Sequence, residues 1–150
     1  MICPLVDLYD LTNYTHFAAT WAMFGVIWFV QLIHYPLLGK VGADSFVAFE
    51  KELLNRTSFV VIPLMVTEIA AAGILAILNW GSELSLLSVI NLVSVALIWV
   101  STFFIQVPLH NKLSDGFDSV AHQKLVLTNW IRTILWTIRG GLAVNLIWAN

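Results

Sequence analysis

The chain has 150 residues, of which 59% are hydrophobic and 11% are charged, and its formal net charge is −2. A soluble domain of this length is about 45–50% apolar and about 25% charged, so the composition excludes an ordinary water-soluble domain and indicates lipid as the main solvent. The small negative charge gives no basis for nucleic-acid binding, and the length suits a single domain, residues 1–150. The lone Cys3 excludes an internal disulfide.

Four stretches of the chain are predicted to be membrane helices, each of which needs roughly 20 mostly apolar residues. They cover residues 17–34, 58–79, 84–106 and 130–148. Pro36 is expected to close the first and Pro108 the third. Only helices and closed barrels cross lipid, and no alternating strand pattern is present. The predicted fold class is therefore all-α, an integral membrane four-helix bundle.

The segments outside these spans carry further expectations. The stretch before the first span has no Lys or Arg and lacks the basic region of a cleavable signal peptide, so the first helix is expected to remain as an anchor. Short amphipathic helices near residues 45–55 and 117–127 are expected to cover one end of the bundle. The second is predicted to run straight into the fourth span, because no Pro or Gly interrupts residues 118–139.

Basic residues predict the orientation. They gather in the two longer links, between spans one and two and between spans three and four: Lys40, Lys51, Arg56, Lys112 and Lys124. The link between spans two and three has none. The positive-inside rule then predicts cytoplasmic longer links and external termini, in a multi-pass protein of a bacterial inner membrane.

The two longer links resemble each other. The stretch FVAFEKELLNRTS (46–58) can be laid beside SVAHQKLVLTNWIRTI (119–134), so that Lys51 meets Lys124 and, after a gap, Arg56 meets Arg132. Upstream, the WFVQ that ends at Gln31 meets the FFIQ that ends at Gln106. The order predicts two tandem helix hairpins offset by about 75 residues and related by an axis along the membrane normal. Chance similarity is the alternative explanation.

Two arginines lie seven residues apart in the fourth span. Arg132 is near its predicted cytoplasmic mouth, where a long side chain can snorkel to the interface. Arg139 is two turns deeper, where a lone charge would cost at least about 2.5–3.5 kcal/mol. Glu68 is the only acidic residue within any span, so we predict that it pairs with Arg139 inside the bundle. Such a pair would either fix helix register or form the polar floor of a cavity.

Further polar residues gather near the predicted cytoplasmic ends of the spans. They are expected to ring one cavity: Gln31, His34, Glu50, Arg56, Gln106, His110, Asn129 and Arg132. Histidine and carboxylate bind transition metals, but no HxxH, HExxH or ExxH spacing is present, so no metal and no other cofactor is predicted. Each histidine is also explained as a helix-end or interface residue.

Two long segments carry a family resemblance. VPLHNKLSDGFDSVAHQKLVLTNWIRTILWTIRGGLAVNLI (107–147) and HYPLLGKVGADSFVAFEKELLNRTSFVVIPLMVTE (34–68) resemble the small four-helix membrane proteins related to anthrone oxygenases, a family mostly of unknown function. Pro108, Asn111, Leu113 and Arg132 fit the family's pattern in the second half. The resemblance implies a four-helix membrane fold and, for the enzymatic members, oxidation of polycyclic anthrones without an obvious cofactor.

The chain departs from this family at two positions. Relatives often place a histidine three residues before each of two arginines, whereas here Leu53 precedes Arg56 and Asn129 precedes Arg132. If those histidines serve catalysis, this chain has lost them. The departure weakens the oxidation that the resemblance implies.

Three functions are compatible with these observations. The first, which we favour from the sequence, is a non-catalytic accessory subunit packed in a larger membrane complex, with lipid and other membrane subunits or copies of itself as partners. The second is an oxygenase-like redox enzyme acting on an apolar substrate in a cavity open to the cytoplasm, with His34, Glu50, His110 and Arg132 as candidate catalytic residues. The third is a small transporter or cofactor-binding bundle. Whether the chain is an enzyme stays open at this point.

Overall fold

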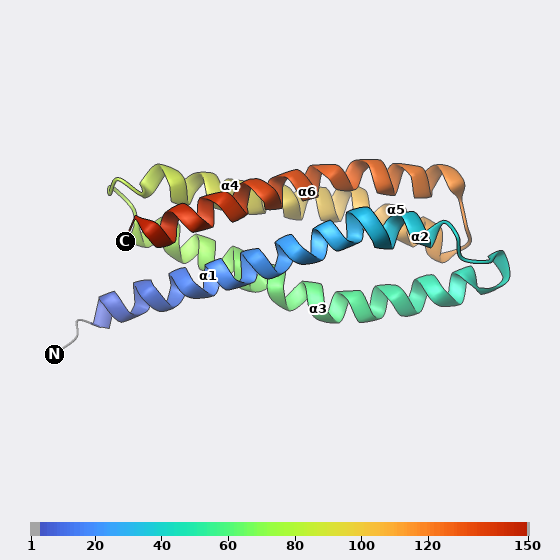
Figure 1. The fold of residues 1–150 in the computed structure, drawn as a ribbon, viewed down its shortest axis with the longest axis horizontal. Helices are drawn as coiled ribbons and strands as arrows, with labels where there is room; N and C mark the ends of the chain where they lie inside the picture. Colours follow the sequence, from blue (N-terminus) through green and yellow to red (C-terminus); the bar gives the residue numbers. More distant parts are fainter. Residues whose placement is uncertain (1–3, 150) are drawn as a thin grey trace.

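The structure, a computed structural model, describes residues 4–149 and the side chains from residue 8 onward. The helical elements, in chain order, are α1 (Pro4–Phe29), the π-helical turn η1 (Val30–His34), α2 (Tyr35–Leu38), α3 (Ala43–Leu78), α4 (Ser85–Ser101), the π-helical turn η2 (Thr102–Gln106), α5 (Val107–Ser114) and α6 (Ser119–Trp148). Because α1–η1–α2 and α4–η2–α5 are each continuous, they form, together with α3 and α6, four long rods (Figure 1). Residues 4–149 contain no strand, which confirms the all-α bundle.

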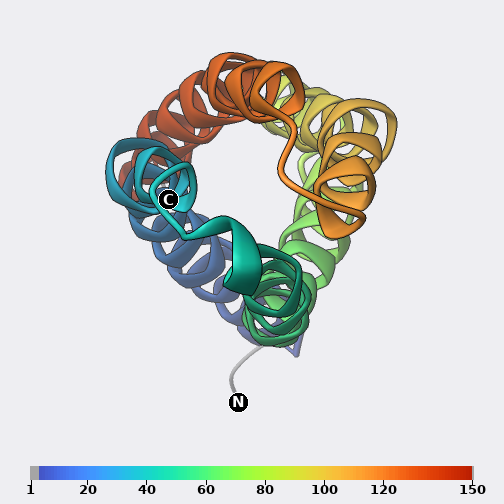
Figure 2. The same ribbon diagram turned by 90° about the vertical axis from the view of Figure 1, so that its right-hand side faces the viewer.

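The four rods form a ring in the order α1, α3, α4, α6 (Figure 2). Each rod packs against its two neighbours in this ring, so α1 lies diagonally opposite α4, and α3 opposite α6. The links 39–42 and 115–118 lie at one end, which we call the basic end. The link 79–84 lies at the other end, near the C-terminus of α6 (Figure 1).

Neither Pro36 nor Pro108 ends its helix, which corrects the boundaries expected from the sequence. Proline has no amide hydrogen, and its ring presses on the carbonyl of the preceding turn, so a regular helix breaks or kinks there. In each rod a π-helical turn precedes the proline, and the helix then continues to Leu38 or Ser114. Such wide turns are rare and occur often at functional sites.

No separate amphipathic helix covers the basic end, so that prediction was wrong. Residues 45–55 form the first part of α3, which continues through Pro63. Residues 119–127 form the first part of α6, which continues without a break through the predicted fourth span, as expected from the absence of Pro and Gly. Asp118 caps α6 by accepting a hydrogen bond from the Ala121 amide. The hydrogen bond from Lys112, followed by that from Ala121, lowers the pKa of the Asp118 carboxyl.

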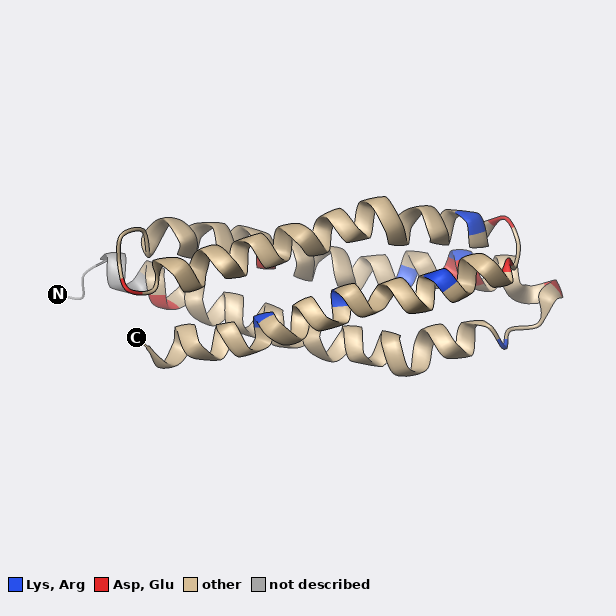
Figure 3. Cartoon of the chain, turned by 90° about the horizontal axis from the view of Figure 1, so that it is seen from above, with Lys and Arg blue, Asp and Glu red and all other residues tan. Residues whose placement is uncertain are grey.

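Three described helices are long and apolar enough to cross a membrane: Leu8–Leu38, Ala43–Leu78 and Ser85–Ser114. These helices indicate a membrane protein. The predicted fourth span, 130–148, lies within α6, which is not among the three. That helix carries both inner arginines, yet it runs beside the other rods, and charged residues are otherwise concentrated at the basic end (Figure 3). Mean hydropathy counts both arginines in full, although in the structure they face the interior of the bundle.

The ring order agrees with the two-hairpin arrangement predicted from the repeat, because matching helices lie diagonally opposite. Two interior hydrogen bonds join residues that are 75 positions apart. They connect His16 with Asn91 in the middle of the bundle and Tyr35 with His110 near the basic end. Contacts between equivalent positions are expected close to a twofold axis, so these pairs support the tandem-hairpin interpretation.

Candidate functional site

The middle of the bundle holds a closed group of polar side chains, which we call the ion-pair cluster: His16, Glu68, Asn91, Trp136 and Arg139. Arg139 forms an ion pair with Glu68, and both side chains are fully buried. The Trp136 indole N–H donates to both carboxylate oxygens of Glu68, at 3.1 and 3.0 Å. Arg139 Nε donates to Asn91 Oδ1 at 2.8 Å, and His16 Nε2 lies 3.3 Å from the same oxygen.

Helix geometry explains why this cluster forms. Arg132, Trp136 and Arg139 follow the spacing i, i+4 and i+7, so they share the inward face of α6. The opposite rod, α3, supplies Glu68, and the ion pair therefore crosses the interior. Both charges are paired, and neither Glu68 nor Arg139 lines the cavity described below, so the arrangement supports a structural function that fixes the register of α3 against α6.

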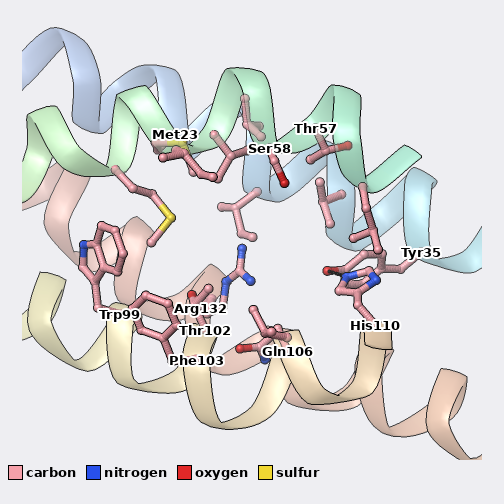
Figure 4. A pocket seen from close by; sticks show the side chains of 18 of the residues that line it. Met23, Tyr35, Thr57, Ser58, Trp99, Thr102, Phe103, Gln106, His110 and Arg132 are labelled. Atoms are coloured by element: carbon pink, nitrogen blue, oxygen red, sulfur yellow. Dashed lines mark hydrogen bonds between the residues drawn. The ribbon is translucent and has the colours of Figure 1, made fainter. Parts of the chain in front are cut away.

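A cavity of about 340 Å³ lies between this cluster and the basic end (Figure 4). We call it the Arg132 cavity. Most of its wall is apolar, including Met23, Ile27, Val61, Met65, Trp99 and Phe103. Its polar lining residues include Tyr35, Thr57, Ser58, Gln106, His110 and Arg132. The volume and the mostly apolar wall with a few polar groups are typical of small-molecule sites.

The cavity reaches the outer surface of the bundle between α3 and the neighbouring rod, α4–η2–α5. Three of its lining residues are exposed there: Ile62 on α3, Phe103 on η2 and Val107 on α5. The backbones of α4 and α5 come close to that of α3, whereas the backbone of η2, which lies between them, does not. The π-helical turn thus leaves the wall open to the side, on a surface that lipid would cover in a membrane.

Arg132 is the one strongly polar group in the middle of the cavity. Its guanidinium points into the open space (Figure 4) and lies 5.4 Å from the centre of the Trp136 ring. No described acidic side chain forms an ion pair with it. The residue is only 8% exposed, so the expectation that it snorkels to the interface was wrong. Arg132 is buried because it lies on the inward face of α6; its distance from the end of the helix does not decide its position.

Three residues that line the cavity have a buried nitrogen atom without a hydrogen-bond partner. These atoms are Trp99 Nε1, Gln106 Nε2 and Arg132 Nε. The Gln106 oxygen accepts a hydrogen bond from the Ser101 hydroxyl at 3.0 Å, which leaves its amide N–H₂ free to donate. Buried polar atoms in native proteins nearly always have a partner, and an unpaired one calls for an explanation such as a ligand or a bound water.

At the basic end of the cavity, three side chains from three helices form a line, which we call the Tyr35 triad. Glu50 Oε1 lies 2.6 Å from His110 Nδ1, and the Tyr35 hydroxyl lies 3.0 Å from His110 Nε2. Glu50 comes from α3, His110 from α5 and Tyr35 from α2. Tyr35 and His110 line the cavity, whereas Glu50 lies behind His110. Tyr35 was missed from the sequence, although its 75-residue separation from His110 matches the repeat and could have marked it.

The remaining predicted cavity residues lie elsewhere. Gln31 and Asn129 are buried between the first rod and α6, where the Asn129 amide donates to Gln31 Oε1 at 2.9 Å. His34 is half-buried at the edge of the triad, with its ring 5.8 Å from that of Tyr35. The expectation that Arg56 lines the cavity was wrong, because its side chain is 80% exposed and pairs with Glu52. Six residues separate Arg56 from the inward Glu50, which turns it by roughly 120° around the helix axis.

In the described part of the chain, no group of three or more His, Cys, Asp or Glu side chains is placed to hold a metal ion. The Tyr35 triad has one carboxylate and one imidazole, already bonded to each other. Its chemistry, as arranged, is therefore that of hydrogen bonding and proton transfer.

Comparisons with models of known protein families, with curated proteins and with solved structures found no match for this chain.

Proposed function

We propose that this membrane protein binds an apolar small molecule in the Arg132 cavity and holds an electron-rich head group of that molecule at Arg132. The observation that carries the proposal is a buried guanidinium without an anionic partner, pointing into an apolar cavity. The free Gln106 amide beside it supplies a second donor. A carboxylate, an oxyanion or a carbonyl oxygen would satisfy both groups.

The energetics favour this interpretation over a purely structural one. An unpaired buried charge costs several kcal/mol, and structural charges are normally paired for that reason. Arg139, seven residues further along the same helix, is such a paired charge, because it forms a buried ion pair with Glu68. The contrast supports a ligand as the missing partner of Arg132.

The opening between α3 and η2 supports a route from the lipid phase. An apolar molecule dissolved in the membrane could enter sideways without crossing water. The concentration of Lys and Arg at the basic end supports a cytoplasmic location for that end, with the termini outside, as expected for a bacterial inner-membrane protein. The ligand head would then lie toward the cytoplasmic side.

This function falls between two of the alternatives that the sequence left open. It is the binding step that an oxygenase-like enzyme or a small transporter would need, and the anthrone-oxygenase resemblance is compatible with it. The accessory-subunit alternative, in contact with lipid and other membrane subunits, gives no use to the cavity or to Arg132. For that reason we prefer ligand binding.

The test uses two probes with the same ring system, 2-naphthoate and naphthalene. Full-length protein in lipid nanodiscs is equilibrated with each probe, and retention is compared with that of empty nanodiscs. Arg132→Met removes the cation and keeps an apolar side chain of similar length. Since a hydrogen bond to a charged group contributes about 1.5–3 kcal/mol, the variant should weaken naphthoate binding by roughly 10- to 100-fold and leave naphthalene binding unchanged.

Arg56→Met is the matched control, because Arg56 is an exposed arginine outside the cavity. It should bind both probes like the parent protein. Equal naphthoate binding by the parent and by a folded Arg132→Met variant would overturn the proposal. Stoichiometric copurification of other membrane proteins, together with no binding of either probe, would instead support the accessory-subunit alternative.

A further inference from the structure

The two hydrogen bonds of the Tyr35 triad can be assigned a donor and an acceptor each, and this assignment shows which atom faces a ligand. An ionised Glu50 carboxylate can only accept, so the His110 Nδ1 atom that it contacts at 2.6 Å carries the hydrogen. When the imidazole is neutral, His110 Nε2 is the acceptor in its 3.0 Å contact with Tyr35. In that state the Tyr35 hydroxyl donates to His110, and its oxygen still has a lone pair that can accept a hydrogen bond from a ligand.

The position of the triad brings that lone pair to the ligand site. Tyr35 and His110 lie together at one end of the cavity, and the Arg132 guanidinium points into its middle (Figure 4). Gln106 lines the same space. A ligand head at Arg132 thus meets hydrogen-bond donors on one side and, at Tyr35, an acceptor on the other. The complementary head group contains one acceptor oxygen and one acidic hydrogen.

We propose, on the basis of the ligand binding proposed above, that the cavity takes apolar hydroxyl acids, such as phenols and enols, and binds them as oxyanions. The ligand O–H bond breaks, and its proton moves to the Tyr35 oxygen. The Tyr35 proton moves at the same time to His110 Nε2. The products are a ligand oxyanion beside Arg132 and an imidazolium beside the Glu50 carboxylate. No proton leaves the protein, and no oxidant or reductant is needed.

The charges around the triad are compatible with this transfer. Glu50 is fully buried and faces His110 from α3, where it stabilises an imidazolium. Arg132 faces the ligand from α6, where it stabilises the oxyanion. His34 lies beside Tyr35 at the end of η1. The nearest lysine in the sequence, Lys112, is paired with Asp118 outside the cavity. The transfer converts a neutral ligand and a neutral imidazole into two ions that each have a partner.

The test uses 4-nitrophenol, whose anion absorbs visible light while its neutral form does not. Nanodiscs carrying the full-length protein are mixed with the probe at a pH where the free probe is mostly neutral. The bound probe should show the absorbance of the anion. Calorimetry in two buffers with different ionisation enthalpies should show no net release of protons to the buffer on binding, since the triad retains the proton.

Tyr35→Phe removes the proton acceptor and keeps the ring. Binding of 2-naphthoate is measured on the same variant, because that probe is already an anion and its retention shows that the site is intact. With 4-nitrophenol the variant should lose the anion band, or show that band only with release of a proton to the buffer. Tyr14→Phe is the matched control, because Tyr14 is 63% exposed and lies outside the cavity lining; it should behave like the parent.

The outcomes separate this inference from the proposed function. If the parent protein binds 2-naphthoate but binds 4-nitrophenol only as the neutral form, or not at all, ligand binding stands and the proton transfer is wrong. An anion band that Tyr35→Phe leaves unchanged, with no proton release, would also overturn the transfer through Tyr35. If neither probe binds, both proposals fail.

Discussion

The buried ion pair between Glu68 and Arg139 gives the most direct test of the energetics described above. Both side chains are fully buried. In Glu68→Gln, Arg139 keeps its hydrogen bond to Asn91 but has no anion. In Arg139→Met, Glu68 keeps the hydrogen bonds from Trp136 but has no cation. Each single change therefore leaves one uncompensated buried charge.

The expected magnitudes follow from that geometry. Removing one partner of a buried pair costs about 3–5 kcal/mol. For a chain of this length, about 2–4 °C of melting temperature corresponds to 1 kcal/mol, so each single change should lower it by roughly 6–20 °C. The double variant contains neither charge, and the glutamine oxygen can still accept from Trp136. Its loss should be only about 1–2 kcal/mol, the cost of the weakened hydrogen bonds.

The assay is thermal unfolding in mild detergent, followed by circular dichroism, for the parent, both single variants and the double variant. The exposed pair Glu52–Arg56 provides a matched control cycle with Glu52→Gln and Arg56→Met. Exposed pairs contribute about 0–1 kcal/mol, so those losses should be small. If the losses at positions 68 and 139 simply add, with no recovery in the double variant, the two charges do not stabilise each other and the reasoning is refuted.

Three further predictions follow from other parts of the structure. Arg132→Met should leave the melting temperature of the ligand-free protein unchanged or raise it, because the change removes an unpaired buried charge; a loss as large as that expected for a broken ion pair would contradict this. Asp118, whose pKa is lowered first by its lysine neighbour, should stabilise the start of α6 above the usual carboxyl pKa and lose this effect as the pH falls through the lowered value. Amide hydrogen exchange in the first turn of α6 should show it, and Asp118→Ala should abolish the pH dependence. Gly39→Ala should cost about 1–3 kcal/mol in thermal unfolding, because the new Cβ would lie 2.7 Å from the His122 ring; Gly42→Ala, with nothing within 4 Å, should cost far less.

The candidate site was only partly predictable from the sequence. The contact between Glu68 and Arg139 could be predicted because a single acidic residue falls within the spans, and a deep arginine needs an anion. Arg132 could be placed near the same helix face, but its burial could not, since snorkelling and inward packing leave the same sequence pattern. Tyr35 was overlooked because an aromatic residue beside a proline at the end of a span is also typical of the membrane interface.

Arg56 shows the limit of the repeat. The two links align in sequence, so Arg56 was expected to match Arg132 in space. In the structure α3 continues through this region as one helix, and the rotation between Glu50 and Arg56 directs the arginine outward. A gap of three residues in the alignment already changes the direction of a helical side chain by about 60°. Repeats of this kind predict helix order better than they predict which side chains face inward.

The sequence alone was enough to predict that this protein lies in a membrane and that its fold is all-α. Only helices and closed barrels satisfy the backbone in lipid, and long apolar segments without an alternating strand pattern leave helices, however those helices pack. Which side chains meet was decided only by the tertiary structure. The π-helical turns before Pro36 and Pro108 shift the helix faces beyond them, and the ring order sets α3 opposite α6. Those two facts bring Tyr35, Glu50 and His110 together and direct Arg132 into the cavity. Such side-chain contacts depend on rotation about four helix axes, which local sequence does not specify.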